Sequence, residues 1–438
     1  MPAMRILPLA FSSLSLLFFL APSSKFAARP QIQPNVVISS IQVSGQRRFS
    51  SEQIVAASGL KIGQPFQPDV LNDAVNRLGD TGAFEFARYN FHPQAGKVSI
   101  ELVVQEAAKF HKCVFDNFVW FSDKELQERV RQRVPLYDGW APEGGNMADA
   151  VGAELEKLLK EKGIPAPVTH TVYGALGDKN WIYLFDADGA KEPVIAVDFD
   201  GAATVDSAAL RKEAAPLLKR NYALTEFRIF ARTTFVPFYR ERGYLQVQLA
   251  DPAAKPAKAE QCLADCEVAV TFPVSEGLVY QWNSAVWTGD LIAAVSALEK
   301  IMGMKEGELA NGKKIDSGFD SVRKEYWGKG YIDAQIKPIA AFDDATKLVT
   351  YAVAITQGPQ YHMGDLHLVG MAPDLANKVK LLWRCKTGDI YDGNYLDSFT
   401  RQEFGKALRD TRTQVKKMNT LPTVNKENKT VDVLIEVN

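Results

Sequence analysis

The feature that most limits how this chain can fold is an order of segments that occurs five times. Each unit opens with an extended run, continues with two helical stretches and closes with two more extended runs. The period is about 80 residues, longer than the roughly 20–50 residues of solenoid repeats, so each unit can be a small domain with its own core. We expect units at 36–106, 107–190, 192–276, 277–357 and 358–438.

The first unit shows the pattern most clearly. "VVISSIQVSG" reads as a strand that Gly45 ends, and Pro68 stands where a helix begins. The apolar residues of that helix share one face, namely Val70, Leu71, Ala74, Val75 and Leu78. "FEFARYNF" and "KVSIELVVQE" then alternate as the strands of a hairpin. A sheet with one apolar face needs helices to cover it. We therefore expect an α+β fold of five tandem β-α-α-β-β domains, each a three-stranded mixed sheet covered by two helices.

The dipeptide Gly-Tyr marks the end of the second helix in the third and fourth units. It stands in "YRERGYLQVQLA", residues 239–250, and in "YWGKGYIDAQI", residues 326–336. Glycine readily takes the left-handed conformation that ends helices. We therefore expect Gly243 and Gly330 to end these helices and the tyrosine after each to begin a strand. Gly82 and Gly163 should end the second helices of the first two units.

The N-terminus has the character of a secretory signal. Arg5 precedes an apolar stretch from Ile6 to Ala21, about as long as the apolar region of a signal peptide and shorter than a membrane span. We expect residues 1–28 to be a signal peptide and the protein to be exported. An uncleaved N-terminal anchor is the alternative.

Paired cysteines in an exported chain indicate disulfides. Cys262 and Cys266 stand close together in "CLADC" and are a candidate disulfide. Cys113 and Cys385 are far apart in the sequence, and we expect each to be buried as a small apolar residue. A bridge between these two stays open.

Charge and motifs argue against several classes of function. The 51 basic and 52 acidic residues leave a net charge of −1, which gives no electrostatic case for binding nucleic acid. No G-x-S-x-G, H-E-x-x-H or P-loop motif occurs. Asp198 and Asp200 fit a strand end entering a turn better than an acid–base pair. We expect no catalytic residues, no metal site and no cofactor.

The repeated unit and its joints resemble the POTRA (polypeptide-transport-associated) domain. The resemblance is carried by "IQVSGQRRFSSEQIVAASGLKIGQPF", "LNDAVNRLGDTGAF", "FYRERGYLQVQL" and "YWGKGYIDAQI", and by the junctions "VVQEAAKF", "VSEGLVYQW" and "ITQGPQYHMGDLHLVG". It covers residues 36–438. The fifth unit departs from the pattern, because no Gly-Tyr follows its second helix and "RTQVKKMNTLP" is the only candidate for its first hairpin strand.

The resemblance to outer-membrane β-barrel assembly proteins of the BamA-like, surface-antigen kind implies a periplasmic array without the C-terminal barrel. Its partners would be unfolded outer-membrane proteins, which add as strands to the sheet edges, and periplasmic or outer-membrane assembly factors. It would reach the outer membrane through a partner or through a missing barrel. The edge stretches implied are 84–91, 166–173, 244–250 and 331–337. The candidate interaction residues within them are Phe84, Tyr89, Tyr244, Gln246, Val247, Gln248, Tyr331, Asp333 and Gln335.

Two other functions stay open at this point. An uncleaved N-terminus would make the protein an inner-membrane-anchored interaction protein, as in division or secretion scaffolds. Alternatively, the chain would be the periplasmic part of a two-partner secretion transporter, although those normally carry fewer units.

Overall fold

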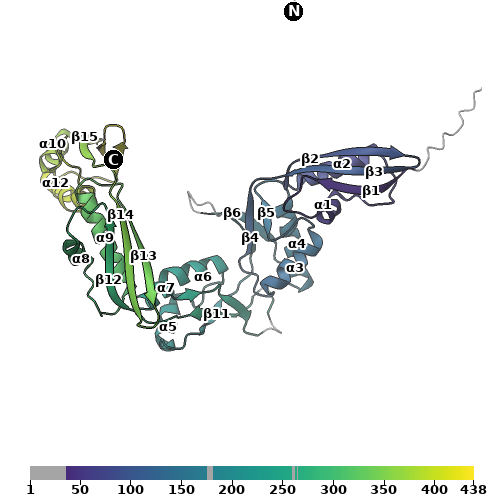
Figure 1. Ribbon diagram of the computed structural model, residues 1–438, viewed down its shortest axis with the longest axis horizontal. Helices are drawn as coiled ribbons and strands as arrows, with labels where there is room; N and C mark the ends of the chain where they lie inside the picture. The colour runs from purple at the N-terminus through teal and green to yellow at the C-terminus, as the bar shows by residue number, and fades with distance from the viewer. Residues whose placement is uncertain (1–35, 175–180, 259–261, 264) are drawn as a thin grey trace, which may run out of the picture. The chain divides into compact units, whose positions relative to one another are not determined.

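The computed structural model describes residues 36–174, 181–258, 262–263 and 265–438. The expected signal peptide at 1–28 therefore lies outside the described residues. Residues 36–109 and 144–146 belong to one compact unit, and the other described residues belong to a second. In the described part of the chain the strands form five sheets, which define the first to the fifth domain (Figure 1).

The elements of the first domain are β1 (Val37–Ser44), α1 (Ser51–Ser58), α2 (Pro68–Asp80), β2 (Phe84–Gln94) and β3 (Lys97–Glu106). Those of the second domain are β4 (Phe110–Phe115), α3 (Asp123–Arg133), β5 (Trp140–Pro142), α4 (Met147–Glu161), β6 (Val168–Tyr173) and β7 (Ile182–Ala187). The third domain contains β8 (Val194–Asp200), α5 (Ser207–Ala214), η1 (Ala215–Leu217), α6 (Leu224–Phe230), the π-helical segment η2 (Ala231–Phe235), α7 (Val236–Arg240), β9 (Gln248–Leu249), β10 (Ala253–Pro256) and β11 (Val268–Ser275).

The fourth domain contains β12 (Gln281–Gly289), α8 (Val295–Met302), α9 (Gly312–Gly328), β13 (Gln335–Asp343) and β14 (Leu348–Thr356). The fifth contains β15 (His362–Val369), α10 (Pro373–Leu382), α11 (Tyr395–Ser398), the π-helical segment η4 (Phe399–Glu403), α12 (Phe404–Thr411), β16 (Met418–Asn425) and β17 (Thr430–Val437).

Every sheet has the same mixed topology. The last strand of each domain lies in the middle, parallel to the first strand and antiparallel to its hairpin partner, as in the order β1-β3-β2. The second domain adds the short strand β5 beside β4, and in the third domain the hairpin strand is divided into β9 and β10. The expected α+β fold with five mixed three-stranded sheets is thus confirmed.

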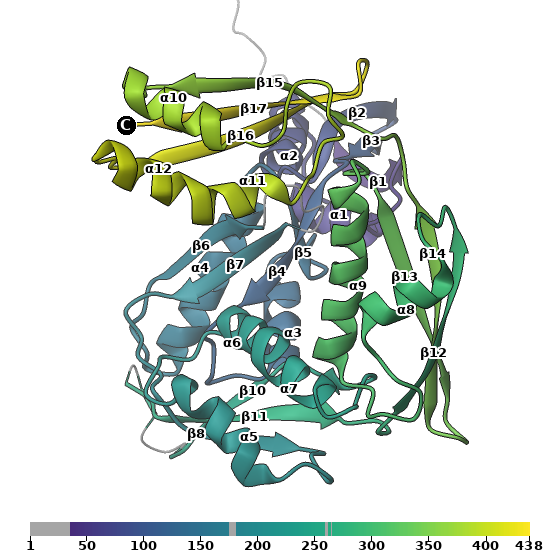
Figure 2. The ribbon, with the colours of Figure 1, turned by 90° about the vertical axis from the view of Figure 1, so that its left-hand side faces the viewer.

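The fourth domain shows how the pattern builds a core. Figure 2 shows α8 and α9 on the same side of the sheet β12-β14-β13. The side chains of α9 that the helical spacing placed on one face are all buried against the sheet, namely Ile315, Phe319, Val322 and Tyr326. The middle strand supplies Val349, Val353 and Ile355 from alternate positions. Alternation on the strand and a spacing of three or four on the helix therefore meet in one apolar layer.

The strands after Gly-Tyr begin later than expected. Tyr244, Gln246 and Val247 precede β9, and Tyr331 and Asp333 precede β13. The reason is that the first backbone N–H groups after each helix bond to carbonyls of its last turn. The N–H of Tyr331 donates to Tyr326 O at 3.0 Å, and the N–H of Tyr244 donates to Tyr239 O at 3.2 Å. Each tyrosine therefore stands before a turn, and of the seven residues expected on these two strands only Gln248 and Gln335 lie in a strand.

The fifth domain ends its second helix without glycine. Arg412 takes the left-handed conformation instead, with φ 50° and ψ 30°, and its N–H donates to Leu408 and Arg409 carbonyls. The hairpin strand β16 then begins at Met418, inside the stretch that the sequence proposed. A side chain in the left-handed region costs about 1–2 kcal/mol relative to ordinary helical backbone, a cost that glycine avoids.

Replacing Arg412 with glycine is therefore expected to stabilise the fifth domain by about 1 kcal/mol. Thermal unfolding of the two proteins measures the change. Arg409→Gly, in the last turn of α12, is the control and should destabilise the domain by up to about 1 kcal/mol. A loss of stability in Arg412→Gly would show that the exposed arginine side chain contributes more than its backbone strain removes.

Candidate interaction edges and joints between domains

The two edges of each sheet differ in how they are covered. On the side of the first strand, one residue exchanges two backbone hydrogen bonds with the loop that precedes the second helix. Ile38 does so with Gly63 and Gln64 at 2.7 and 3.0 Å, and Trp282 with Gly307 and Glu308 at 2.8 Å each. Val194 and Met363 make the same pair of bonds in their domains. The first-strand edge is therefore partly capped by the domain itself.

The hairpin strand forms the other edge, and no described strand pairs with its outer side. These edge strands are β2, β6, β9 with β10, β13 and β16. Within the described residues four of the five edges contain a proline, namely Pro93, Pro256, Pro338 and Pro422. Proline fits an edge strand where its nitrogen points away from the neighbouring strand. Since the backbone groups of an antiparallel strand alternate between its two sides, each proline also identifies the outward-facing positions.

In the first domain the pairing of β2 with β3 is unbroken from Phe86 to Pro93. Counting back from Pro93 by twos, the backbone N–H and C=O groups of Ala87, Tyr89 and Phe91 point away from β3. The Tyr89 hydroxyl donates to Asn72 Oδ1 on α2 at 3.0 Å. The Phe91 ring packs beside that of Phe66 at 5.4 Å and remains 45% exposed. The edge of β2 thus presents free backbone groups next to an accessible aromatic surface. Phe84, in contrast, is buried against Phe49.

The Gly-Tyr dipeptides build the joints between consecutive domains. The Gly243 carbonyl accepts the N–H of Tyr280 at 3.0 Å, and the Gly330 carbonyl accepts that of Tyr361 at 2.8 Å. Tyr280 and Tyr361 stand just before the first strands of the fourth and fifth domains, and both are buried. The left-handed glycines, with φ of 86° and 82°, hold their carbonyls next to the following domain. Gly82 and Gly163 also take positive φ values, of 73° and 78°.

The polar residues after Gly-Tyr complete these joints. The Tyr280 hydroxyl donates to Asp344 Oδ1 at 2.6 Å and lies 2.8 Å from Gln246 Oε1. In the next joint the Tyr361 hydroxyl donates to Asp333 Oδ2 at 2.8 Å. Gln246 and Asp333 each stand three residues after the glycine, so the two joints use equivalent positions. Both residues were expected on a peptide-binding strand, but the structure places them between domains.

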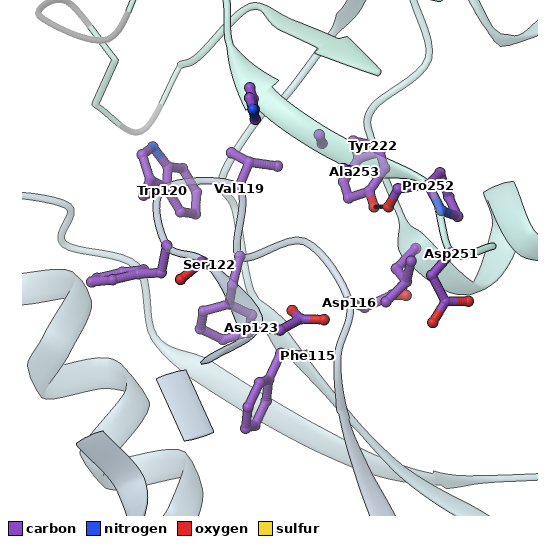
Figure 3. Close-up of a pocket in the computed structure, with 15 residues that line it drawn as sticks. Phe115, Asp116, Val119, Trp120, Ser122, Asp123, Tyr222, Asp251, Pro252 and Ala253 are labelled. Carbon is purple, nitrogen blue, oxygen red and sulfur yellow. Dashed lines mark hydrogen bonds between the residues drawn. The ribbon is translucent and has the colours of Figure 1, made fainter. Parts of the chain in front are cut away.

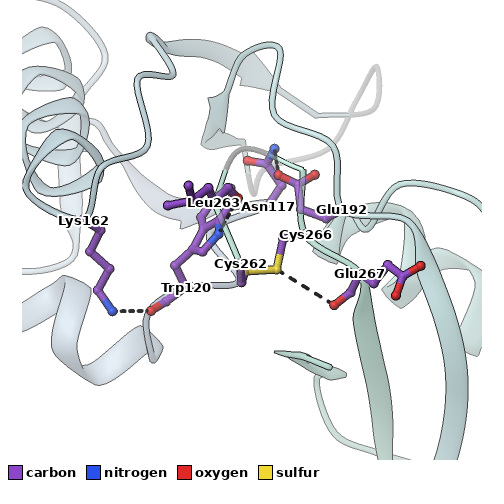
Figure 4. Close-up of a disulfide and its surroundings, with 8 residues drawn as sticks. All are labelled: Asn117, Trp120, Lys162, Glu192, Cys262, Leu263, Cys266 and Glu267. Carbon is purple, nitrogen blue, oxygen red and sulfur yellow. Dashed lines mark hydrogen bonds between the residues drawn. A yellow bond between two sulfur atoms is a disulfide. The ribbon is translucent and has the colours of Figure 1, made fainter. Parts of the chain in front are cut away.

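The second and third domains are joined by a different set of residues. Cys262 and Cys266 form a disulfide in the loop between β10 and β11 (Figure 4). The neighbouring Leu263 carbonyl accepts the indole N–H of Trp120 at 3.1 Å, and Lys162 Nζ donates to the Trp120 carbonyl at 2.8 Å. Trp120 is therefore fixed from both sides. Of the two remaining cysteines, Cys113 is buried and Cys385 half-buried, and both are free thiols.

A buried acidic side chain lies in the same joint. Glu192, between β7 and β8, is 1% exposed, and its Oε1 accepts from Asn117 Nδ2 at 3.4 Å. Burial raises the pKa of Glu192 to about 7, with the carboxyls of Asp186 and Asp265 adding to the effect. Burial likewise raises the pKa of Asp186 to about 6. The cluster is not visible in the sequence, because Asn117 and Asp265 are distant from Glu192 along the chain.

A pocket of about 440 Å³ separates the loop after β4 from the edge strand β10. Figure 3 shows Val119 and Trp120 on one side of it and Pro252 and Ala253 on the other. Asp116, Asp123 and Asp251 supply carboxyl groups to its lining.

Neither a metal-binding cluster nor a membrane-spanning helix occurs in the described ranges. No group of three or more His, Cys, Asp or Glu residues there is placed to hold a metal ion. None of the helices described has the length and apolar character needed to cross a membrane. Asp198, which we expected at a strand end entering a turn, forms a surface ion pair in which its Oδ1 lies 3.1 Å from Arg211 Nη2.

Two segments, residues 36–107 and 280–358, match the family model POTRA, described as a surface antigen variable number repeat. They correspond to the first and the fourth domain. A putative outer membrane protein assembly factor of Treponema pallidum (strain Nichols) is 21% identical over 180 residues, which make up 40% of this chain and 21% of that protein. The matched part thus spans about a fifth of the length of this curated relative.

Solved structures give weaker similarities of the same kind. The POTRA 3–5 fragment of BamA from Haemophilus influenzae is 19% identical, covers 56% of this chain and 96% of that chain, and has a TM-score of 0.45. The N-terminal domain of Omp85 from Thermosynechococcus elongatus is 13% identical, covers 73% and 96%, and has a TM-score of 0.19. The two family-model matches and the fivefold sheet topology carry more weight than these scores.

Proposed function

Because two segments match the POTRA family model and all five sheets share one mixed topology, we propose that the chain is a non-catalytic periplasmic POTRA array that binds unfolded outer-membrane proteins by strand addition. Assembly factors in the periplasm or the outer membrane would be its further partners. In this proposal the protein is exported, associates with the outer membrane and acts in the assembly or insertion of outer-membrane proteins. The name of the Treponema relative points in the same direction.

The observation that carries the proposal is the asymmetry between the two edges of each sheet. A loop caps the first-strand edge in four domains and β5 lies beside it in the second, while the outer side of the hairpin strand has no described strand beside it. An extended client can therefore pair with the unoccupied N–H and C=O groups of the hairpin strand. Backbone pairing depends little on side chains, which suits a protein that receives many different unfolded clients.

The first domain supplies the longest edge for such pairing. β2 has 11 residues, and its outward positions lie next to the exposed ring of Phe91. An incoming strand would gain main-chain hydrogen bonds from β2 and apolar contact from this ring. Specificity for alternating apolar segments, which outer-membrane strands possess, would follow from that contact.

Ala87→Pro tests the proposal at this edge. Because the Ala87 N–H faces outward, proline should leave the pairing of β2 with β3 intact while removing one donor for a client. We expect affinity of the full chain for an unfolded outer-membrane protein fragment to fall several-fold in a fluorescence anisotropy titration, with an unchanged melting profile.

Ala87→Ser is the matched control, since it alters the side chain and keeps the N–H, and it should bind as the unmodified protein does. Equal affinity for all three proteins would exclude the β2 edge. If the unmodified protein binds no unfolded client at all, the proposed function itself is wrong.

A further inference from the structure

The pocket between the second and third domains has two firmly held walls. On the second domain, Phe118, Val119 and Trp120 are each less than 10% exposed, and Trp120 is held by bonds to Leu263 and Lys162. On the third domain, the Tyr222 hydroxyl donates to the Pro252 carbonyl at 3.0 Å. The cavity of about 440 Å³ is therefore lined by side chains that have fixed partners of their own.

One wall contains a sheet edge. The Ala257 N–H donates to the carbonyl of Glu267, the residue before β11, at 2.8 Å, so position 257 faces inward. By alternation, the N–H and C=O of Ala254 and the C=O of Pro256 face the open side of β10. Ala253, Ala254 and Lys255 all line the pocket. A peptide in the pocket could therefore pair with β10 over about three residues.

The pocket also has an excess of negative charge. Of its four ionisable side chains other than Tyr222, three are the carboxyls Asp116, Asp123 and Asp251, and one is Lys255. Asp251 is neutralised by Arg228. Asp116 accepts the Thr225 N–H at 2.7 Å, and no ion pair to Asp116 or Asp123 is found among the described residues. Desolvation raises the pKa of both carboxyls and the charge of Arg228 opposes the shift, so a further cation brought close to them would favour their ionised form.

From these features we infer that the pocket selects client segments in which a large apolar residue and a Lys or Arg stand two residues apart. Such a segment pairs with β10 and places both side chains on one face, because alternate residues of a strand point the same way. The apolar side chain packs against Val119 and Trp120, and the basic group approaches Asp116 and Asp123. This inference rests on the proposed function and adds to it a preference for basic segments at one particular edge.

The test uses two fluorescent peptides and the full chain. One peptide is acetyl-Thr-Thr-Phe-Thr-Lys-Thr-Thr-amide, and the other has Glu in place of Lys. We expect the lysine peptide to bind at least fivefold more tightly than the glutamate peptide in anisotropy titrations. Asp123→Asn should weaken binding of the lysine peptide about threefold and leave the glutamate peptide unaffected. Ala254→Pro, which removes the outward donor of β10, should weaken both peptides by tenfold or more.

Asp198→Asn is the matched charge control, because Asp198 is an exposed carboxyl on β8, at the opposite edge of the same sheet. It should bind both peptides as the unmodified protein does. If Ala254→Pro melts early, the Asp123→Asn result alone decides the question. Equal binding of the two peptides, or an unaltered response in Asp123→Asn, would overturn the inference. An unfolded client that still binds in that case leaves the proposed function in place, whereas failure of every client would remove both.

Discussion

Replacing Gly330 with valine is expected to destabilise the joint between the fourth and fifth domains by about 3 kcal/mol or more. Gly330 has φ 82°, which a β-branched residue adopts only with strain. A Cβ atom there would also lie 2.7 Å from the Tyr361 carbonyl oxygen and 3.0 Å from Ile390 Cγ2. The backbone of the next domain would have to move, so the bond from Tyr361 to Gly330 should be lost. Hydrogen exchange at the Tyr361 amide measures this directly.

Gly307→Val provides the matched control within the same domain. Gly307 has φ 76°, but no atom lies within 4 Å of the position its Cβ would take. The Gly307→Val protein should therefore lose only the roughly 1–2 kcal/mol that a side chain costs in the left-handed region. Hydrogen exchange at the Tyr361 amide should remain slow. Similar losses in both variants would mean that the contact with the fifth domain contributes nothing.

The second large effect concerns Glu192. Burial raises its pKa from 4.5 to about 7. Between these two pH values the folded protein therefore keeps a proton on Glu192 that the unfolded chain has released. The stability associated with this proton is complete below about pH 4.5 and is lost as the pH rises through about 7. Glutamine copies the neutral acid at every pH. Glu192→Gln should therefore match the unmodified protein at pH 4.5 and be more stable at pH 8.5 by about 3 kcal/mol.

The measurement is the opening free energy of the segment from β7 to β8, obtained by hydrogen exchange at the two pH values and corrected for intrinsic exchange. Some pH dependence should remain in Glu192→Gln, because Asp186 is also buried enough for its pKa to rise to about 6. Asp200→Asn removes an exposed carboxyl of the third domain and should behave as the unmodified protein. A Glu192→Gln protein that is less stable at pH 8.5 would show that the buried carboxylate is stabilised in its charged form.

The fold could be predicted because its determinants are local. The helical face of Ile315, Phe319, Val322 and Tyr326 and the alternation along β17 are each visible within about ten residues. Both patterns reappear in the structure as buried layers, which is why the sheets and helices were found where the sequence indicated.

The interaction residues were harder to predict, because their roles depend on groups distant in sequence. An alternating run after Gly-Tyr suggests a strand, but the helix end takes up the amides of Tyr244 and Tyr331 first. The side chains of Gln246 and Asp333 then contact the hydroxyls of Tyr280 and Tyr361, which stand 34 and 28 residues further along the chain. A sequence comparison of the two joints could have found the tyrosines, since both follow a glycine by three residues in "GLVY" and "GPQY".

Under the proposed function, the prolines in the edge strands would limit how a client is held. Pro93, Pro256, Pro338 and Pro422 each remove one outward donor from the edge that contains them, so a long client cannot form an unbroken ladder along any of these four strands. Each contact is then short, and a single domain releases its segment quickly. Retention of a client would depend on several domains engaging it at once, so that the local concentration of one segment is raised by the binding of another. In this proposal, an array of interrupted edges would hold a long unfolded chain firmly while every individual segment remains free to leave and fold.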